Sequence, residues 1–190
     1  MSRIVLESSS TAHWQKLVLE AEASCQMPLN EDLESYLVFL LMRHTAKSDI
    51  TSNIMAMEYL HSLTANGQLQ QDKLRDVGDQ CLIFSGLFPK LAEKRMVKIS
   101  YYVGIGVSAY HFLAETCKDQ LCEFYHQLAD EFVHLMDILQ VIRSMNRSAN
   151  TMSTLEAIEL WGDTGSKSAL QTVKETTDST ICLDTSLFKH

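Results

Sequence analysis

The sequence predicts an all-α fold, a compact multi-helix bundle, on three observations. Only two prolines and seven glycines occur in 190 residues, whereas a sheet protein of this length needs many more turn residues. Apolar residues recur at helical spacing nearly everywhere after residue 9. No internal repeat or strand pattern is found. We therefore expect one helical domain over residues 1–174 and a flexible tail over 175–190.

The first three helices are expected at residues 11–25, 31–44 and 51–65. Asn30 should cap the second helix, because its side chain can accept a hydrogen bond from a free N–H of the first turn. The pair Asn66-Gly67 should end the third.

A fourth helix should run over residues 70–85 and then turn at Gly86. Pro89 suits the first turn of the next helix, where its missing N–H costs nothing. Whether residues 88–117 form one helix or two stays open.

The stretch "ISYYVGIGVSAYHFLA" is apolar around nearly its whole circumference. This pattern predicts a buried central helix over about 99–117. The stretch is too short, and too rich in Tyr, Ser and His, for a membrane span.

The longest expected helix runs from Asp119 to Asn146, followed by two short C-terminal helices at about 154–161 and 166–174. Ser153 and Glu156 have the spacing of a capping box. Ser166 is expected to cap the last helix.

Within the long helix, "EFYHQLADEFVHLMD" contains Glu-x-x-His twice, a spacing that supplies metal ligands in some bundles. His126, Asp130 and His134 could bridge a surface ion. The polar stripe from Glu123 to Asp137 lies opposite the apolar stripe, however. We therefore favour a solvated face that only a further layer of protein would cover, and no metal site.

Small residues on two helices suggest that these helices pack closely. A helical glycine costs about 1 kcal/mol relative to alanine, so a close contact should compensate. The alternative is a ligand lying against the exposed backbone. The candidates on the fourth helix and on the central helix are Gly78, Ser85, Gly104, Gly106 and Ser108.

A second set of residues carries polar groups into apolar surroundings, where they need partners. Asp79 is expected to meet a tyrosine, a histidine or a basic residue such as Arg95. If these groups converge on a cavity, it is the default functional site. The candidates are Asp79, Tyr101, Tyr102, Tyr110 and His111. A metal version would add His44 or His61 with Glu58 or Glu93, but no spacing singles these out.

The formal charge of −8 opposes binding to phosphate backbones and anionic lipid, so no nucleic-acid partner is expected. Five irregularly spaced cysteines and the lack of a signal peptide predict a reducing cytoplasm. The one basic run is read as a solvated face and consists of Lys90, Lys94, Arg95 and Lys98.

The motifs "GDQCLIFSGLFP" (78–89), "YYVGIGVSAYHFLA" (101–114) and "WGDTGS" (161–166) resemble a family of uncharacterised bacterial helical proteins. The resemblance covers residues 30–174. It implies a shared domain and attaches no activity to it.

Without a phosphate loop, a nucleophile elbow or a cysteine metal cluster, the catalytic residues are unknown. We expect a protein-interaction or self-associating module with no cofactor. The alternative is an enzyme or a cofactor or metal binder with a pocket around Asp79, Tyr110 and His111.

Overall fold

The computed structural model describes residues 10–46, 54–90, 96–118, 120–146 and 152–176. Within these ranges the chain is helical and contains no strand, which confirms the predicted all-α bundle. The helices are α1 (Ser10–Cys25), α2 (Glu31–Ala46), α3 (Met55–Leu63), α4 (Gly67–Leu87), α6 (Ile99–Thr116), α7 (Gln120–Asp130), α8 (Phe132–Asn146), α9 (Thr154–Thr164) and α10 (Lys167–Thr176).

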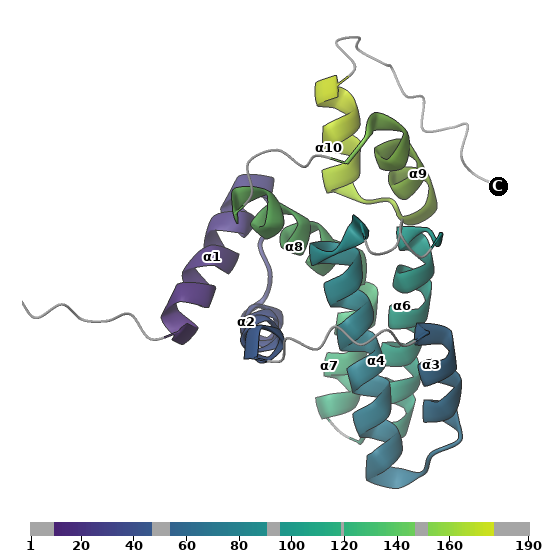
Figure 1. The fold of residues 1–190 in the computed structure, drawn as a ribbon. Coiled ribbons are helices and arrows are strands. Elements are labelled where there is room, and N and C mark those ends of the chain that lie inside the picture. The colour runs from purple at the N-terminus through teal and green to yellow at the C-terminus, as the bar shows by residue number, and fades with distance from the viewer. Residues whose placement is uncertain (1–9, 47–53, 91–95, 119, 147–151, 177–190) are drawn as a thin grey trace, which may run out of the picture.

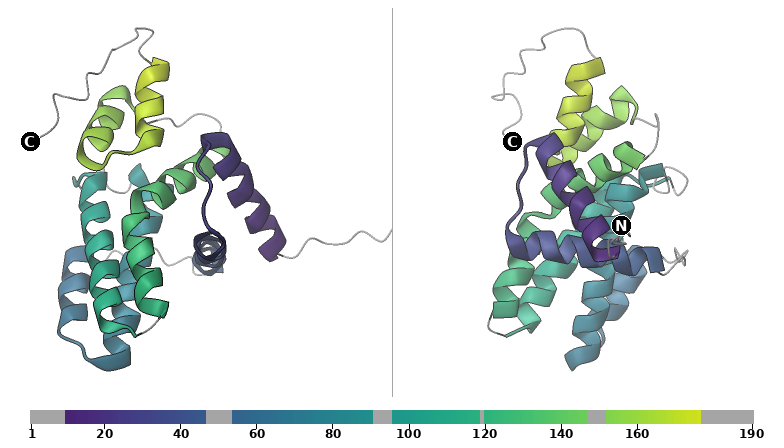
Figure 2. Two further views of the ribbon diagram at one scale, coloured as in Figure 1. Left: turned by 180° about the vertical axis from the view of Figure 1, so that it is seen from behind. Right: turned by 90° about the vertical axis from the view of Figure 1, so that its left-hand side faces the viewer.

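Helices α3, α4, α6 and α7 stand side by side and form the body of the bundle (Figure 1). Helix α2 runs crosswise to them, and α1 packs on α2 and α8 (Figure 2). The hairpin of α9 and α10 sits at one end, against α6 and α8. Among the described helices, none has the length and apolar character needed to cross a bilayer.

Helix α6 is the central element, since it packs against α3, α4, α7, α8 and α9. Its inward residues include Tyr102 and Tyr110, which are 2% and 0% exposed. One side of α6 faces solvent, since Gly104 and Ser108 are exposed. The region 88–117 is not one helix: Met96, with a φ of 55°, lies in a turn before α6, and residues 91–95 lie outside the described residues.

Close packing of small residues occurs at some of the expected positions. A Cβ added to Gly78 would lie 2.4 Å from the Tyr110 ring, and one added to Gly106 would lie 2.4 Å from the Phe132 ring. At Gly104 and Ser108 the expectation is wrong: both face outward, and no atom lies within 4 Å of an added Cβ at Gly104.

Both ends of α4 differ from the boundaries that the sequence predicts. Gly86 does not turn the chain but lies inside α4, where an added Cβ would be 2.4 Å from Leu139 Cβ. It therefore lets α8 approach, as does Ser85, which is fully buried. At the other end, α3 already stops at Leu63 and Gly67 begins α4 with a φ of 60°.

The predicted helix caps are confirmed. Asn30 Oδ1 accepts a hydrogen bond of 2.9 Å from Leu33 N. Ser153 and Glu156 form the reciprocal capping box of α9. Ser166 Oγ accepts a bond of 3.0 Å from Ala169 N at the start of α10.

The expected helix from Asp119 to Asn146 is divided at Glu131 into α7 and α8. Backbone hydrogen bonds still pass through this point, from Glu131 N to Gln127 O and from Leu135 N to Glu131 O. The break redirects α8 toward α1 (Figure 1). Residues 175 and 176 of the expected tail belong to α10, and the rest of the tail lies outside the described residues. Glu93, Lys94 and Arg95 also lie outside them. The single domain over residues 1–174 stays a prediction.

Candidate functional site

The carboxylate of Asp79 on α4 is buried in the bundle, with an exposed fraction of 2%. Tyr36 and Tyr110 donate hydroxyl hydrogen bonds of 2.5 Å and 2.8 Å to its Oδ1. Arg43 forms a charged hydrogen bond with its Oδ2. We call Tyr36, Arg43, Asp79 and Tyr110 the Asp79 clamp, because they join α2, α4 and α6.

The local sequence explains how the clamp assembles. Tyr36 and Arg43 are seven residues apart, and so they lie on one face of α2 two turns apart and can reach the same carboxylate. On α6, the Tyr110 ring crosses α4 at Gly78, where the glycine leaves room for it. The glycine beside Asp79 thus allows the hydrogen bond to form.

Burial governs the electrostatics of the clamp. It raises the pKa of the Asp79 carboxyl, while the Arg43 charge and the two hydroxyls oppose this shift. Burial, together with the Asp79 charge, also raises the pKa values of Tyr36 and Tyr110. Both tyrosines therefore stay protonated and act as donors. With three donors on its two oxygens, Asp79 serves as an anchor between helices.

The other predicted pocket residues lie apart from the clamp. The Tyr101 hydroxyl accepts a 3.3 Å hydrogen bond from Ala56 N on α3. The Tyr102 ring is buried, and its centre lies 5.5 Å from the centre of the Phe84 ring. His111 is half-buried, and its ring centre lies 5.7 Å from that of His126 on α7. The structure thus brings together Asp79 and Tyr110 and leaves His111 at a different place.

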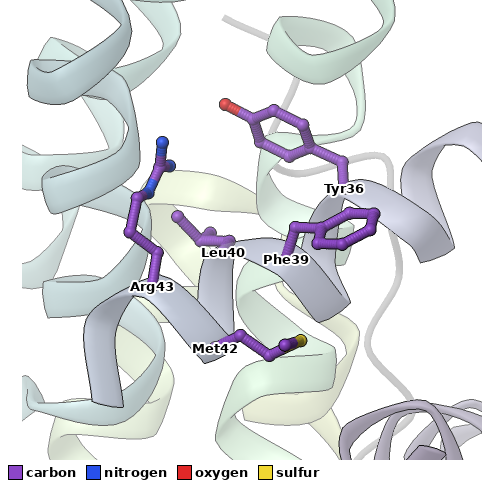
Figure 3. Close-up of a pocket in the computed structure, with 5 residues that line it drawn as sticks. All are labelled: Tyr36, Phe39, Leu40, Met42 and Arg43. Atoms are coloured by element: carbon purple, nitrogen blue, oxygen red, sulfur yellow. The ribbon is translucent and has the colours of Figure 1, made fainter. Parts of the chain in front are cut away.

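An open hollow of about 440 Å³ lies beside the clamp on the face of α2. It is lined by Tyr36, Phe39, Leu40, Met42 and Arg43, which all leave the same helix (Figure 3). We call these five residues the α2 hollow. Leu40 is buried, whereas Phe39 is 61% exposed, an unusual position for a phenylalanine. The Arg43 side chain is 39% exposed and belongs both to the clamp and to the hollow.

Sequence reasoning missed Tyr36, Phe39 and Arg43. In the sequence, Arg43 stands near the expected end of the second helix, where a cation suits the helix dipole, and nothing there indicates a further role. The signal that was present is the spacing of Tyr36, Leu40 and Arg43, which places an aromatic hydroxyl and a guanidinium on one edge of the apolar face of α2. Only the tertiary structure shows which carboxylate they meet.

The Glu-x-x-His stripe faces outward only in its first half. Glu123, His126 and Asp130 are exposed, and His134 is partly buried. The expectation is wrong for Asp137, which is 1% exposed because the α9–α10 hairpin covers it. No group of three or more metal-ligating residues is present in the described part of the chain.

Asp137 binds the N-terminus of α10. It accepts hydrogen bonds from Ser166 Oγ at 2.5 Å, Lys167 N at 2.8 Å and Ser168 N at 3.2 Å. A carboxylate at this position satisfies free N–H groups and interacts favourably with the helix dipole. Asp137 therefore forms a buried polar link between α8 and the C-terminal hairpin.

We expect Asp137→Asn to lower the free energy of unfolding by about 1–3 kcal/mol, because the N–H donors of α10 lose a charged acceptor in a buried place. Urea unfolding followed by circular dichroism measures this. Asp130→Asn, at an exposed position of α7, is the control and should change the value by no more than about 0.5 kcal/mol. Equal effects of the two substitutions would contradict the assigned role.

No family model, curated protein or solved structure matches this chain. The resemblance to bacterial helical proteins therefore stays a prediction, and the function has to be argued from the Asp79 clamp and the α2 hollow.

Proposed function

We propose that this protein is a protein-interaction module that binds a partner through the α2 hollow. The observation that carries the proposal is the position of Phe39, 61% exposed beside an open hollow of about 440 Å³. Large aromatic side chains are enriched at the centres of protein interfaces. An open hollow on one helix is suited to an apolar side chain of a partner.

The Asp79 clamp gives the α2 hollow a fixed shape. Tyr36 and Arg43 are held by hydrogen bonds to Asp79, so that two of the five lining side chains lose little freedom when a partner binds. Met42 adds a flexible, polarizable surface that can adapt to the partner. Preformed walls with one adaptable side chain favour binding.

The surrounding charges favour a basic partner. Asp32 lies on the same face of α2 as Phe39, seven residues earlier, and is exposed. Asp76 is exposed on α4 and interacts electrostatically with Arg43, whose own charge faces Asp79. We therefore propose an amphipathic partner segment with an apolar anchor and neighbouring Lys or Arg. A second copy of this chain also carries −8, and charge repulsion disfavours it.

The alternative, an enzyme or cofactor binder with a pocket around Asp79, Tyr110 and His111, has less support. The Asp79 oxygens already accept three hydrogen bonds, and His111 lies beside α7. The cytoplasm remains the proposed location; the described cysteines, all free thiols, are compatible with a reducing compartment.

Site-specific photo-cross-linking tests the proposal. p-Benzoylphenylalanine is placed at Phe39 in the full chain, in cells that make the protein, and the cross-linked peptides are sequenced. We expect one main product, attached at a segment with Lys or Arg next to apolar residues. The control position is Leu155 on α9, which is 68% exposed. The same products from both positions, or a cross-link to a second copy of this chain, would overturn the proposed partner.

Phe39→Asp should separate binding from folding. Because the Phe39 side chain is mostly exposed, the substitution is expected to change the free energy of unfolding by no more than about 0.5 kcal/mol. The partner captured by cross-linking from a neighbouring lining position, Met42, should be lost. Retention of that product in a folded Phe39→Asp variant would count against the α2 hollow.

A further inference from the structure

Two histidine rings meet at the surface where α6 packs against α7. His111 on α6 is half-buried, and His126 on α7 is exposed. Their ring centres lie 5.7 Å apart, and the ring planes are tilted by 53°. The sequence pattern grouped His126 with residues of its own helix, whereas the structure gives it a histidine partner on the adjacent helix.

Both rings have nitrogen atoms available for a ligand. In the part of the chain that the structure describes, neither His111 nor His126 forms a hydrogen bond or an ion pair. A neutral imidazole carries one N–H and one lone pair, so each ring offers one nitrogen lone pair. Two lone-pair donors from different helices therefore lie next to each other at a surface that solvent reaches.

We propose that His111 and His126 form a two-histidine site for a divalent transition-metal ion such as Zn²⁺, which joins α6 to α7. Imidazole nitrogen is a good ligand for Zn²⁺, Ni²⁺ and Cu²⁺. The site is separate from the α2 hollow and does not depend on the function proposed for it.

The distance between the rings fits a shared ion. A Zn–N bond of about 2.0–2.1 Å puts each ring centre about 3.2 Å from the ion, and a tetrahedral angle then separates the two centres by about 5 Å. The observed 5.7 Å is close to this separation. The torsion about the Cβ–Cγ bond of histidine is broad, so a small rotation of each ring can direct a nitrogen to the ion.

The surrounding charges favour a cation. Glu115 lies one turn after His111 on α6, and Glu123 and Asp130 lie one turn before and after His126 on α7; all three are exposed. Residues three or four apart share a helix face, so these carboxylates flank the rings and attract a cation. No group of three or more metal-ligating residues is present among the described residues, so in the proposed site water completes the coordination of the ion.

Binding by both rings should be much tighter than binding by either ring alone. Once one imidazole holds the ion, the second is present at a high effective concentration, which is worth about 100-fold or more in affinity. Helices α6 and α7 already pack against each other, so little ordering is needed when the ion binds. Because the unfolded chain does not hold the two rings together, the ion should also raise the temperature of unfolding.

Isothermal titration calorimetry of the full chain with ZnCl₂, in a buffer that does not chelate metals, tests the site. We expect one ion per chain, and binding about 100-fold weaker in His111→Gln and in His126→Gln. His13→Gln, at an exposed position of α1, is the control and should keep the affinity of the unchanged protein. Circular dichroism verifies that each variant is folded. No zinc binding by the unchanged protein, or an unchanged affinity in either of the first two variants, would overturn the proposal.

Nuclear magnetic resonance of the imidazole rings identifies the ligands directly. ZnCl₂ should shift the signals of His111 and His126 together, whereas MgCl₂ should shift neither, because Mg²⁺ prefers oxygen ligands. The competing ligands are the free thiols of Cys117 and Cys122, near the connection between the same helices. A variant with both Cys117→Ser and Cys122→Ser should keep its zinc affinity. Loss of affinity in this variant, or a shift of one ring alone, would assign the ion to other ligands and overturn the two-histidine site.

Discussion

Replacing Asp79 with asparagine is expected to lower the free energy of unfolding by about 2–4 kcal/mol. The substitution keeps the size of the side chain but removes the charge that Arg43 faces. It also leaves an amide N–H₂ to compete with the donors from Tyr36 and Tyr110. Removing one partner of a fully buried pair costs more, but the Arg43 side chain is 39% exposed and keeps some contact with water.

Urea unfolding of Asp79→Asn, followed by circular dichroism, measures this loss. Asp76→Asn is the matched control, since Asp76 lies one turn earlier on α4 and is exposed. It should change the free energy of unfolding by no more than about 0.5 kcal/mol. An Asp79→Asn protein as stable as this control would show that the clamp contributes nothing to folding.

Two glycines of α6 are expected to respond in opposite directions to alanine. In Gly106→Ala, the new Cβ would lie 2.4 Å from Phe132 Cε2 and 2.9 Å from Cys81 Cβ. Both neighbours are almost completely buried and have little room to move. Overpacking of this kind costs about 1–3 kcal/mol, which exceeds the gain in helix propensity.

Gly104→Ala is the matched substitution on the same helix. No atom lies within 4 Å of its new Cβ, so only the helix propensity changes. We expect a gain of up to about 1 kcal/mol in the free energy of unfolding. Thermal and urea unfolding of the two variants measure the difference. Destabilisation of similar size at both positions would contradict the described packing of α6.

The helical class and most helix boundaries could be predicted, because amphipathic periodicity and capping residues are local. Asn30, Ser153 and Ser166 cap helices as their types suggest. Gly104 and Gly106 could not be told apart from sequence. Both interrupt an apolar helix, and only the position of α4 and α8 decides which glycine faces Cys81 and Phe132.

The candidate site was predictable only in part. A buried Asp79 needs donors, and this reasoning identified Tyr110 as a candidate. The basic partner, Arg43, lies 36 residues away on a helix that crosses the bundle, and no local pattern links it to Asp79. The sequence predicts an outward-facing Asp137, and this prediction is wrong for a related reason. Its helical position is polar, and the hairpin that buries it is a tertiary contact made by residues about 30 positions later.

The Asp79 clamp that ties α2 to the bundle is tested most directly by a double-mutant cycle of Arg43→Met and Asp79→Asn in urea unfolding. If the two side chains hold α2 together, the effects are not additive, and Asp79→Asn costs less in the Arg43→Met background. We expect a coupling energy of about 1–3 kcal/mol, and about zero for Arg43→Met with Asp130→Asn, at an exposed position of α7. Additive effects of Arg43→Met and Asp79→Asn, within about 0.5 kcal/mol, would contradict the account.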